Sequence, residues 1–203
     1  MIRRLLDLIF SLFWLFFLAP VILAIAVLIK LDSPGSILYT PQMVGRNGNL
    51  FHLFRFRTMY TDKPSHLSTN ERLTQVGRFI RNYSLDHLPI LVNLLKGDLT
   101  LVGPRPMETE VVNLQEPQWQ RYFQAKPGLF NYAVLKLGKM WTPTRTNRPT
   151  LNQELELEYI QKRSLMSDLR LFSRSIRAFI VSKGNMKARG EPDSAIGDQL
   201  NSD

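Results

Sequence analysis

Residues 8–29, LIFSLFWLFFLAPVILAIAVLI, decide how this chain folds, because they contain no charged side chain. At about 1.5 Å rise per residue, a helix of this length just crosses the hydrocarbon core of a bilayer. Large apolar side chains occur on all sides of such a helix, which favours lipid over a buried core position. A cleaved signal peptide is a poorer explanation, because the LDSP sequence at 31–34 is a poor cleavage site. We therefore expect a membrane segment that the mature protein retains.

Pro20 lies near the middle of this segment and predicts a break in the helix. Proline has no N–H to donate to the carbonyl of Phe16, and its ring clashes there, so the helix should kink. Cations flank both ends, with Arg3 and Arg4 before the segment and Lys30 after it. A simple span usually shows a stronger Lys/Arg bias on one side. These residues alone leave two alternatives open: a re-entrant helix that enters and leaves on one face, and a kinked helix that spans the bilayer.

The rest of the 203-residue chain has the composition of a soluble domain. The whole chain is 44% hydrophobic and 21% charged with a net charge of +9, which excludes a disordered chain and a multi-span membrane protein. The lack of Cys excludes disulfides and a Cys nucleophile, and three scattered His residues argue against a zinc site. We expect a membrane helix over residues 1–31, one domain over residues 32–183 and a disordered tail over residues 184–203.

Hydrophobic periodicity predicts a mostly helical α+β domain with a short β element. Partial alternation over residues 50–57 predicts a strand with Arg55 and Arg57 on one face and Phe54 and Phe56 on the other. The predicted helices cover residues 73–80, 88–95, 110–124, 153–161 and 167–181. Loops are predicted over residues 61–70 and 97–106, and a turn over residues 126–128.

Asp86 is the leading candidate for chemistry. Pro89 fits only in the first turn of the following helix, which places Asp86 at or near the N-cap, where backbone N–H groups favour an anion. A carboxylate held ionised there, with Arg78 and Arg81 nearby, can attack a phosphorus centre or hold Mg²⁺. The alternative is that Asp86 only caps a helix.

Two further arginines are candidates for phosphate binding. Arg105 lies between two prolines on a loop, and a guanidinium on a rigid loop suits a pair of phosphate oxygens. Arg57 lies on the cationic face of the predicted strand. The alternatives are a solvated loop arginine and an ordinary two-faced strand.

In order along the chain, these motifs resemble the bacterial sugar transferases, the monotopic phosphoglycosyl transferases that start lipid-linked glycan assembly. The resemblance runs from about Arg3 to Val181. It rests on the apolar segment with its central proline and on IKLDSPG at 29–35, VGRNG at 44–48, FRTM at 56–59, SLD at 84–86, NLLKGD at 93–98, LVGPRP at 101–106 and KPG at 126–128.

The resemblance implies a re-entrant helix broken at Pro20 and a monotopic protein on the cytoplasmic face of the bacterial inner membrane. It implies transfer of a sugar 1-phosphate from a UDP-sugar to a polyprenyl phosphate with release of UMP, as the first step of exopolysaccharide or lipid-linked oligosaccharide synthesis. Mg²⁺ is the implied cofactor. The resemblance makes Asp86 the nucleophile and a metal ligand, and it places His87 in the catalytic pair with Asp86. Phosphate or substrate binding is expected of Arg57, Arg81, Arg105 and Glu156.

Among the positions that depart from the family pattern, two concern its Asp-Glu pair and its late Asp. His87 replaces the Glu of the pair, and neutral imidazole is a poorer partner for Mg²⁺. It can still donate a hydrogen bond to phosphate or act as a base near neutral pH. Glu156 replaces the late Asp and keeps its charge.

These departures keep two alternatives open besides an active enzyme. One is a catalytically silent membrane-bound relative that scaffolds or regulates a polysaccharide assembly partner. The other is a basic peripheral protein that binds anionic lipid or nucleic acid, which the membrane helix and the Arg-Pro loop fit poorly. We therefore expect no nucleic-acid partner. The protein partners that we consider are a second copy of this chain, in a homo-oligomer, and other proteins of glycan assembly.

Overall fold

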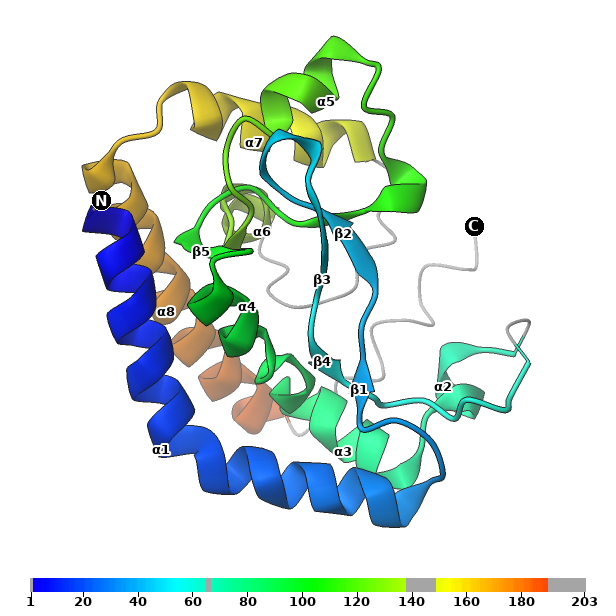
Figure 1. Cartoon of the computed structure of the whole chain (residues 1–203). Helices are drawn as coiled ribbons and strands as arrows, with labels where there is room; N and C mark the ends of the chain where they lie inside the picture. Colours follow the sequence, from blue (N-terminus) through cyan, green and yellow to red (C-terminus); the bar gives the residue numbers. More distant parts are fainter. Residues whose placement is uncertain (1, 65–66, 138–148, 190–203) are drawn as a thin grey trace.

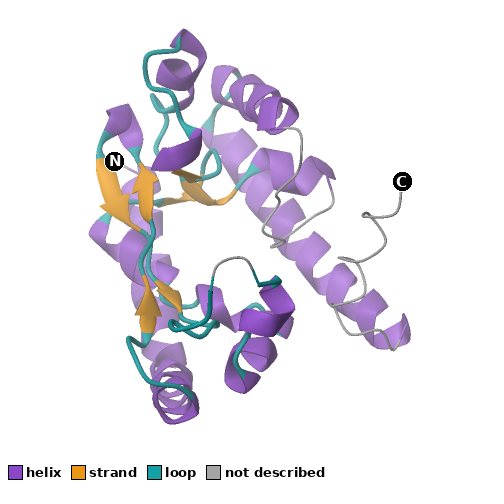
Figure 2. Ribbon diagram, turned by 90° about the vertical axis from the view of Figure 1, so that its right-hand side faces the viewer, coloured by secondary structure: helices purple, strands orange, loops and turns teal. Residues whose placement is uncertain are grey.

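The computed structural model describes residues 2–64, 67–137 and 149–189. Within them the chain is a mostly helical α+β protein whose short strands lie between helices, as the sequence predicted (Figure 1, Figure 2). The helices are α1 (Ile2–Asp32), α2 (Thr69–Arg72), α3 (Gln75–Asn82), α4 (Ile90–Lys96), α5 (Pro117–Tyr122), α6 (Tyr132–Leu137), α7 (Pro149–Gln161) and α8 (Leu165–Arg189). Turns of 3-10 helix are η1 (Arg46–Gly48), η2 (Leu85–His87) and η3 (Thr109–Val111). The strands are β1 (Leu38–Tyr39), β2 (Gln42–Val44), β3 (Leu50–His52), β4 (Arg55–Phe56), β5 (Thr100–Val102), β6 (Met107–Glu108) and β7 (Gly128–Phe130).

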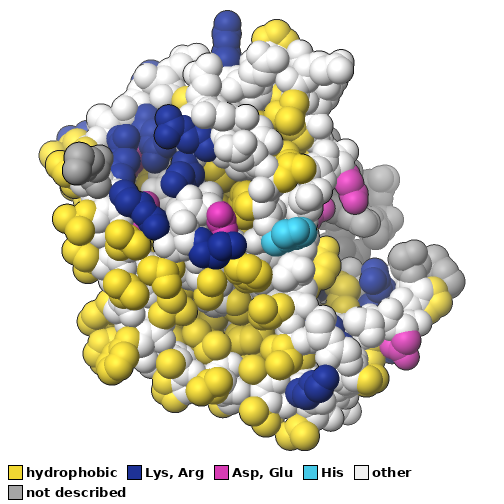
Figure 3. All heavy atoms as spheres, viewed as in Figure 1, with side chains coloured by type: hydrophobic (Ala, Val, Ile, Leu, Met, Phe, Trp, Pro, Cys, Tyr) yellow, Lys and Arg dark blue, Asp and Glu magenta, His cyan; other side chains and the backbone are white. Residues whose placement is uncertain are grey.

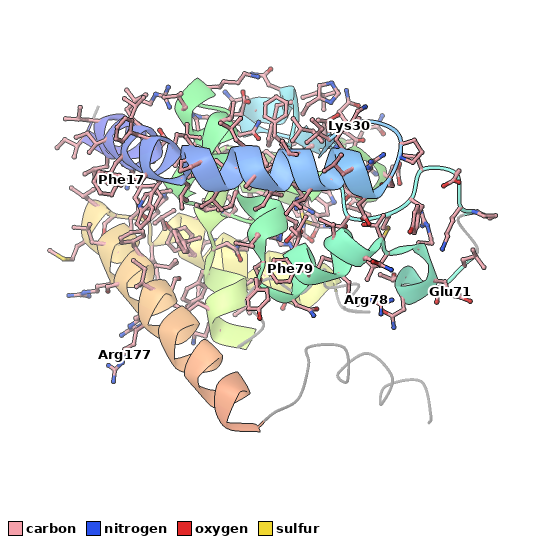
Figure 4. All side chains as sticks on the ribbon, turned by 90° about the horizontal axis from the view of Figure 1, so that it is seen from below. Phe17, Lys30, Glu71, Arg78, Phe79 and Arg177 are labelled. Atoms are coloured by element: carbon pink, nitrogen blue, oxygen red, sulfur yellow. The ribbon has the colours of Figure 1, made fainter. Side chains whose placement is uncertain are left out.

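Helix α1 is bent sharply about half-way along its length, in the stretch that holds Pro20 (Figure 1, Figure 4). The bend agrees with the missing N–H and the ring clash of a proline inside a helix. By length and composition α1 is apolar enough to cross a membrane, and only 11% of its most apolar 18-residue window is buried inside the protein. Its exposed side chains include Ile9, Leu12, Phe13, Phe16 and Phe17. An exposed apolar surface of this extent is typical of membrane association.

Polar contacts fix the N-terminal arm of α1 on the rest of the protein. The buried carboxylate of Asp7 accepts hydrogen bonds from the hydroxyl of Thr100 (3.1 Å) and the backbone N–H of Leu101 (2.8 Å). Arg4 donates hydrogen bonds of 2.8 and 2.7 Å to two carbonyl oxygens in the last turn of α4. Those carbonyls lack partners within their own helix, so Arg4 satisfies them.

The C-terminal arm of α1 contributes apolar side chains to the protein core. Ile25 and Ile29 are buried against Phe56 of β4 and Ile80 of α3. A second cluster, under β2, β3 and α4, comprises Met43, Phe51, Leu53, Ile90, Leu91, Leu94 and Leu99. Both arms of α1 therefore pack on the same folded unit.

The strand predicted over residues 50–57 is two separate strands. β3 pairs antiparallel with β2, and β4 pairs antiparallel with β1. Between them the backbone N–H of Phe54 donates to the side-chain oxygen of Asn93 (2.8 Å), and the N–H of Leu53 donates to the carbonyl of Pro41 (3.0 Å). After pairing with β2, the chain bonds to Asn93 of α4 and only then pairs with β1. The alternation of apolar residues does not indicate this interruption.

Two segments predicted as a loop and a turn contribute strands. β5 lies in the predicted loop over residues 97–106 and pairs in parallel with β7, which begins at the predicted turn. The strands approach closely because both contacting positions are glycine: a Cβ on Gly128 would lie 2.1 Å from the nitrogen of Gly103. The helix predicted over residues 110–124 is wrong in its first half, since α5 begins only at Pro117, a residue favoured in a first helical turn.

The other predicted helices are present as α3, α4, α7 and α8, with shifted ends. Helix α8 continues to Arg189, past Gly184, where the sequence predicted the start of a tail. Residues 190–203 lie outside the described residues. The predicted tail and domain boundaries therefore stay predictions.

Candidate active site

The segment between α3 and α4 carries Asp86 and His87. Helix α3 ends at Asn82, and Ser84 then takes up a left-handed conformation with φ of 56°, which turns the chain into η2. Gly77 allows α3 to lie directly on the preceding chain, because a Cβ there would come within 2.0 Å of the carbonyl oxygen of Thr58. The position of Asp86 is thus set by the close packing of α3 and by the turn at Ser84.

Asp86 does not cap α4, which corrects the prediction from Pro89. The N-cap position of α4 is Pro89 itself, which has no side-chain cap bond, and Asp86 lies earlier, inside η2. The N–H of Leu88 donates to the carbonyl of Leu85 (3.1 Å), so helical turns already exist before α4 begins. The charge of Asp86 therefore depends on its neighbours rather than on a capping position.

Burial raises the pKa of the Asp86 carboxyl above its ordinary value, and the charges of Arg55 and Arg81 oppose that rise. The side chain of Asp86 is 13% exposed. Both arginines are partly buried beside it, and burial lowers the pKa of each guanidinium while Asp86 opposes this change. The result is a carboxyl group held among cations, with little water around it.

His87 is neutral at physiological pH. Burial, reinforced by the charges of Arg55, Arg81 and Arg105, lowers the pKa of His87 to about 3. Its Nε2 lies 3.5 Å from Oδ2 of Asp86, and with a neutral ring this contact is not an ion pair. This lowered pKa argues against His87 as a base that titrates near neutral pH. A neutral imidazole still offers one hydrogen-bond donor and one acceptor.

Arg55 is a member of this site that the sequence did not single out. Its charge interacts with Asp86, Arg105 and Glu108, and its buried Nε makes no hydrogen bond. An unpaired buried N–H of a guanidinium is costly, so it favours an anionic ligand. The signal in the sequence is the FRFR run at 54–57, whose alternation places Arg55 on the same face as Arg57.

Glu156 lies buried on α7 and joins the site through Arg105. Its Oε1 accepts a hydrogen bond from the N–H of Ala133 (2.9 Å), and its buried Oε2 makes none. Burial raises the pKa of Glu156 to about 8, opposed by backbone N–H groups of Ala133 and Tyr132 and by Arg105. The carbonyl of Arg105 accepts from the hydroxyl of Tyr122 (2.8 Å). The charge of Arg105 thus acts on both the buried glutamate and the imidazole of His87.

The family model for bacterial sugar transferases matches residues 1–182 of this chain. The chain belongs to the bacterial sugar transferase family. This match confirms the resemblance drawn from the motifs.

Several members of the sugar transferase family are similar over most of this chain. A protein of Caulobacter vibrioides named "UDP-glucose:undecaprenyl-phosphate glucose-1-phosphate transferase" is 33% identical over 190 residues, which are 89% of this chain and 70% of that protein. The "Uncharacterized sugar transferase EpsL" of Bacillus subtilis is 32% identical over 188 residues, 90% of this chain and 89% of its own length. The "Undecaprenyl-phosphate glucose phosphotransferase" of Komagataeibacter xylinus is 33% identical over 194 residues, 89% of this chain but 36% of its own length. The chain thus corresponds to one part of that longer sugar transferase.

In this sugar transferase Arg57, which follows β4, is buried against the residues that come directly after α1. Its Nη2 donates to the carbonyl oxygen (2.8 Å) and the hydroxyl (3.0 Å) of Ser33, and its Nη1 donates to the carbonyl of Pro34. Gly35 packs against it, since a Cβ there would lie 2.2 Å from Nη1. The contacts of Arg57 therefore hold the chain in place after α1. The charge of Arg81 acts on Asp86 and His87, and that of Arg105 acts on His87 and Glu156.

The site residues fit Mg²⁺ only if the substrate supplies most of the ligands. The described part of the chain contains no group of three or more His, Cys, Asp or Glu that could hold a metal ion. Mg²⁺ usually keeps several waters and takes one or two carboxylates together with substrate phosphates. Asp86 is one such carboxylate, so the site suits a metal that arrives with a diphosphate rather than one held by the sugar transferase alone.

Proposed function

We propose that this chain transfers a sugar 1-phosphate from a UDP-sugar to a polyprenyl phosphate and releases UMP. The family assignment supports this reaction, as do the names of its relatives from Caulobacter and Komagataeibacter. The observation that carries the proposal is the carboxyl group of Asp86, which is little exposed and interacts electrostatically with Arg55 and Arg81. A carboxylate among guanidinium groups suits a nucleophile that must approach a diphosphate.

The reaction proceeds in two displacements at phosphorus. A carboxylate oxygen of Asp86 forms a bond to the β-phosphorus, the bond to the bridging oxygen breaks, and UMP leaves with the electron pair. A phosphate oxygen of the lipid then attacks the same phosphorus and displaces the carboxylate, which restores Asp86. The product is a sugar linked through a diphosphate to the lipid.

The neighbouring residues bind and stabilise charge during both steps. Arg55, Arg81 and Arg105 present positive charge where the phosphoryl oxygens gain negative charge, and this stabilises the transition state. The neutral ring of His87 donates a hydrogen bond to a phosphate oxygen from its N–H. Asp86 would be the protein carboxylate for Mg²⁺ that arrives with the diphosphate, and the metal would supply positive charge to the leaving phosphate.

We place α1 as a re-entrant helix at the cytoplasmic face of the inner membrane. Both arms of α1 contact one folded unit. Asp7 in the N-terminal arm accepts a hydrogen bond from β5, and Ile29 in the C-terminal arm packs in the core with Ile80. A single domain cannot lie on both sides of a bilayer, so both ends of α1 belong on one side. The chain has no native cysteine, so single cysteines at Ile2 and Ser36 test this arrangement in sealed vesicles. Labelling of both from one side is expected, and labelling from opposite sides would contradict it.

The reaction is tested by UMP release from UDP-sugars in membranes that contain polyprenyl phosphate. UDP-glucose is the first donor to try, because two of the relatives are named for glucose. Asp86→Asn is expected to abolish UMP release and any phosphosugar adduct, because an amide is a poor nucleophile. The matched control is Asp62→Asn, the same change at an exposed loop residue, which should turn over at the wild-type rate.

Two outcomes would contradict the proposal. Wild-type turnover by Asp86→Asn would exclude the covalent mechanism. If neither the wild type nor His87→Glu, which restores the family pair, releases UMP from any of a broad set of UDP-sugars, the chain is a catalytically silent relative.

A further inference from the structure

A second polar site exists beside the N-terminal end of α1. A hollow of about 400 Å³ opens there between α1, η1, the segment before β7 and the region around the end of α7. Among its described lining residues are five cations, and none of the groups placed around Asp86 is included. The five are Arg3, Arg4, Arg46, Lys126 and Arg163.

Two motifs that the candidate active site does not use meet at this hollow. Arg46 comes from VGRNG, and Lys126 comes from KPG. They are far apart in sequence, yet Nε of Arg46 donates to the carbonyl of Gln124 (3.2 Å), two residues before Lys126. The cluster is therefore formed by separate segments that the fold brings together, and not by one basic run of sequence.

The cations of the hollow are held in place without losing their charge. Lys126 donates to the carbonyl of Gly97 (2.6 Å), and Arg163 donates to the carbonyl of Val102 (2.6 Å). A neutral carbonyl orients a cation and restricts its motion but does not cancel its charge. The side chains are thus positioned before any ligand arrives, which lowers the entropy lost on binding.

Carboxylates compensate only part of this charge. Asp7 lines the hollow, but it already accepts two hydrogen bonds from β5. Asp168 pairs with Arg3 (2.7 Å) and lies 3.5 Å from Nε of Arg163. Burial lowers the pKa of Lys126, and the like charges of Arg4 and Arg46 add to the effect, partly opposed by Asp7 and Asp98. An excess of positive charge remains in the hollow, and a bound anion would relieve the repulsion.

The hollow lies next to the surface that α1 presents to lipid. Figure 3 shows Lys and Arg side chains gathered beside the N-terminal end of α1, on the same face as a broad hydrophobic area below them. When lipid covers the hydrophobic area, the cations lie at the depth of the headgroups. Basic pockets at this depth bind anionic headgroups.

We propose that this hollow binds the phosphate group of an anionic ligand at a site separate from the one that contains Asp86. The chemistry recognised is a phosphate monoester or diester, held by guanidinium and ammonium donors on fixed backbones. A phospholipid headgroup and a free phosphate share this chemistry, and the experiment distinguishes them.

A single thiol in the hollow gives a readout independent of the active site. Gln124 lines the hollow and is exposed, and the chain has no other cysteine, so Gln124→Cys introduces a unique thiol there. Its rates of modification by a negatively charged and a positively charged methanethiosulfonate reagent are compared in the full-length chain in neutral detergent. Gln118→Cys, exposed on α5, is the reference thiol.

The measured quantity is the rate of modification by the anionic reagent divided by the rate for the cationic reagent. The positive potential of the hollow predicts that this ratio is about tenfold higher at position 124 than at position 118. Adding Lys126→Gln or Arg46→Gln should reduce this preference severalfold. Arg121→Gln removes the same charge from the exposed surface of α5 and should leave the preference unchanged.

Protection of the thiol identifies the source of the phosphate. Slower modification in vesicles of phosphatidylcholine with phosphatidylglycerol than in phosphatidylcholine alone identifies a lipid headgroup. Slower modification with inorganic phosphate at constant ionic strength identifies a free phosphate. The proposal is overturned if neither protects, if position 124 shows no more preference for the anionic reagent than position 118, or if Arg121→Gln reduces this preference as much as Arg46→Gln.

Discussion

Replacing Arg57 by lysine separates the structural role of this residue from the substrate role that its motif suggests. The guanidinium of Arg57 makes three hydrogen bonds, two to Ser33 and one to Pro34, which fix the chain as it leaves α1. Lysine keeps the positive charge but presents a single ammonium group, which cannot copy the planar fork. Arg57→Lys therefore removes about two of the three contacts and leaves the charge of the protein unchanged.

The magnitude follows from those contacts. A hydrogen bond to a charged group contributes about 1.5–3 kcal/mol to stability. Two lost bonds, partly compensated by relaxation and water, should lower the free energy of unfolding by about 3 kcal/mol. For a chain of this size, each kcal/mol shifts the melting temperature by about 2–4 °C. We expect Arg57→Lys to melt about 10 °C below the wild type, with KM for the UDP-sugar unchanged at temperatures where it is folded.

The assay combines circular dichroism melting in detergent with kinetics of UMP release. Arg55→Lys is the matched control, because it is the same change two residues away, at the side chain that faces Asp86. It should raise KM and shift the melting temperature less than Arg57→Lys does. The reasoning is refuted if Arg57→Lys melts like the wild type and raises KM instead.

Three further predictions follow from buried groups. Burial raises the pKa of Glu156 from 4.5 to about 8, so the folded state holds this proton more tightly and stability should fall as pH rises between these values. Glu156→Gln should remove that fall in a series of melts from pH 5 to pH 9, and an unchanged slope would argue against it. His87, with a pKa of about 3, should show constant imidazole NMR shifts between about pH 5 and pH 8, whereas an inflection there would show that it titrates. Gly77→Ala should destabilise the fold by about 1–3 kcal/mol in chemical denaturation, because the new methyl would overlap the carbonyl of Thr58; wild-type stability would mean that α3 can move away.

Local patterns in the sequence predicted those parts of the fold that depend on local periodicity. The apolar segment, its break at Pro20 and four of the soluble helices appear where their patterns place them. Local patterns did not predict the strands β5 and β7, because both are short and form through pairing between segments far apart in sequence. The position of Asp86 was also missed, since η2 depends on the left-handed Ser84, a conformation that serine rarely adopts.

The candidate site shows the same division between local and tertiary information. The motif SLD indicated Asp86, but the charge environment of Asp86 comes from residues on other elements. Arg55 and Arg57 are chemically identical and two positions apart, and only the packing of α1 assigns one to the site and the other to holding the chain after α1. The low pKa of His87 likewise comes from burial, and then from three arginines that no local pattern brings together.

The dual anchorage of α1 has a practical consequence for producing this protein. A truncated form without α1 would lose Asp7, leaving the N–H of Leu101 without its acceptor, and would open the cluster that holds Ile25 and Ile29. The helix is therefore not a removable tether that can be cut off or exchanged for another anchor to obtain a water-soluble catalyst. Purification has to keep the whole chain in detergent or a nanodisc, and fusion partners belong elsewhere than between α1 and the domain.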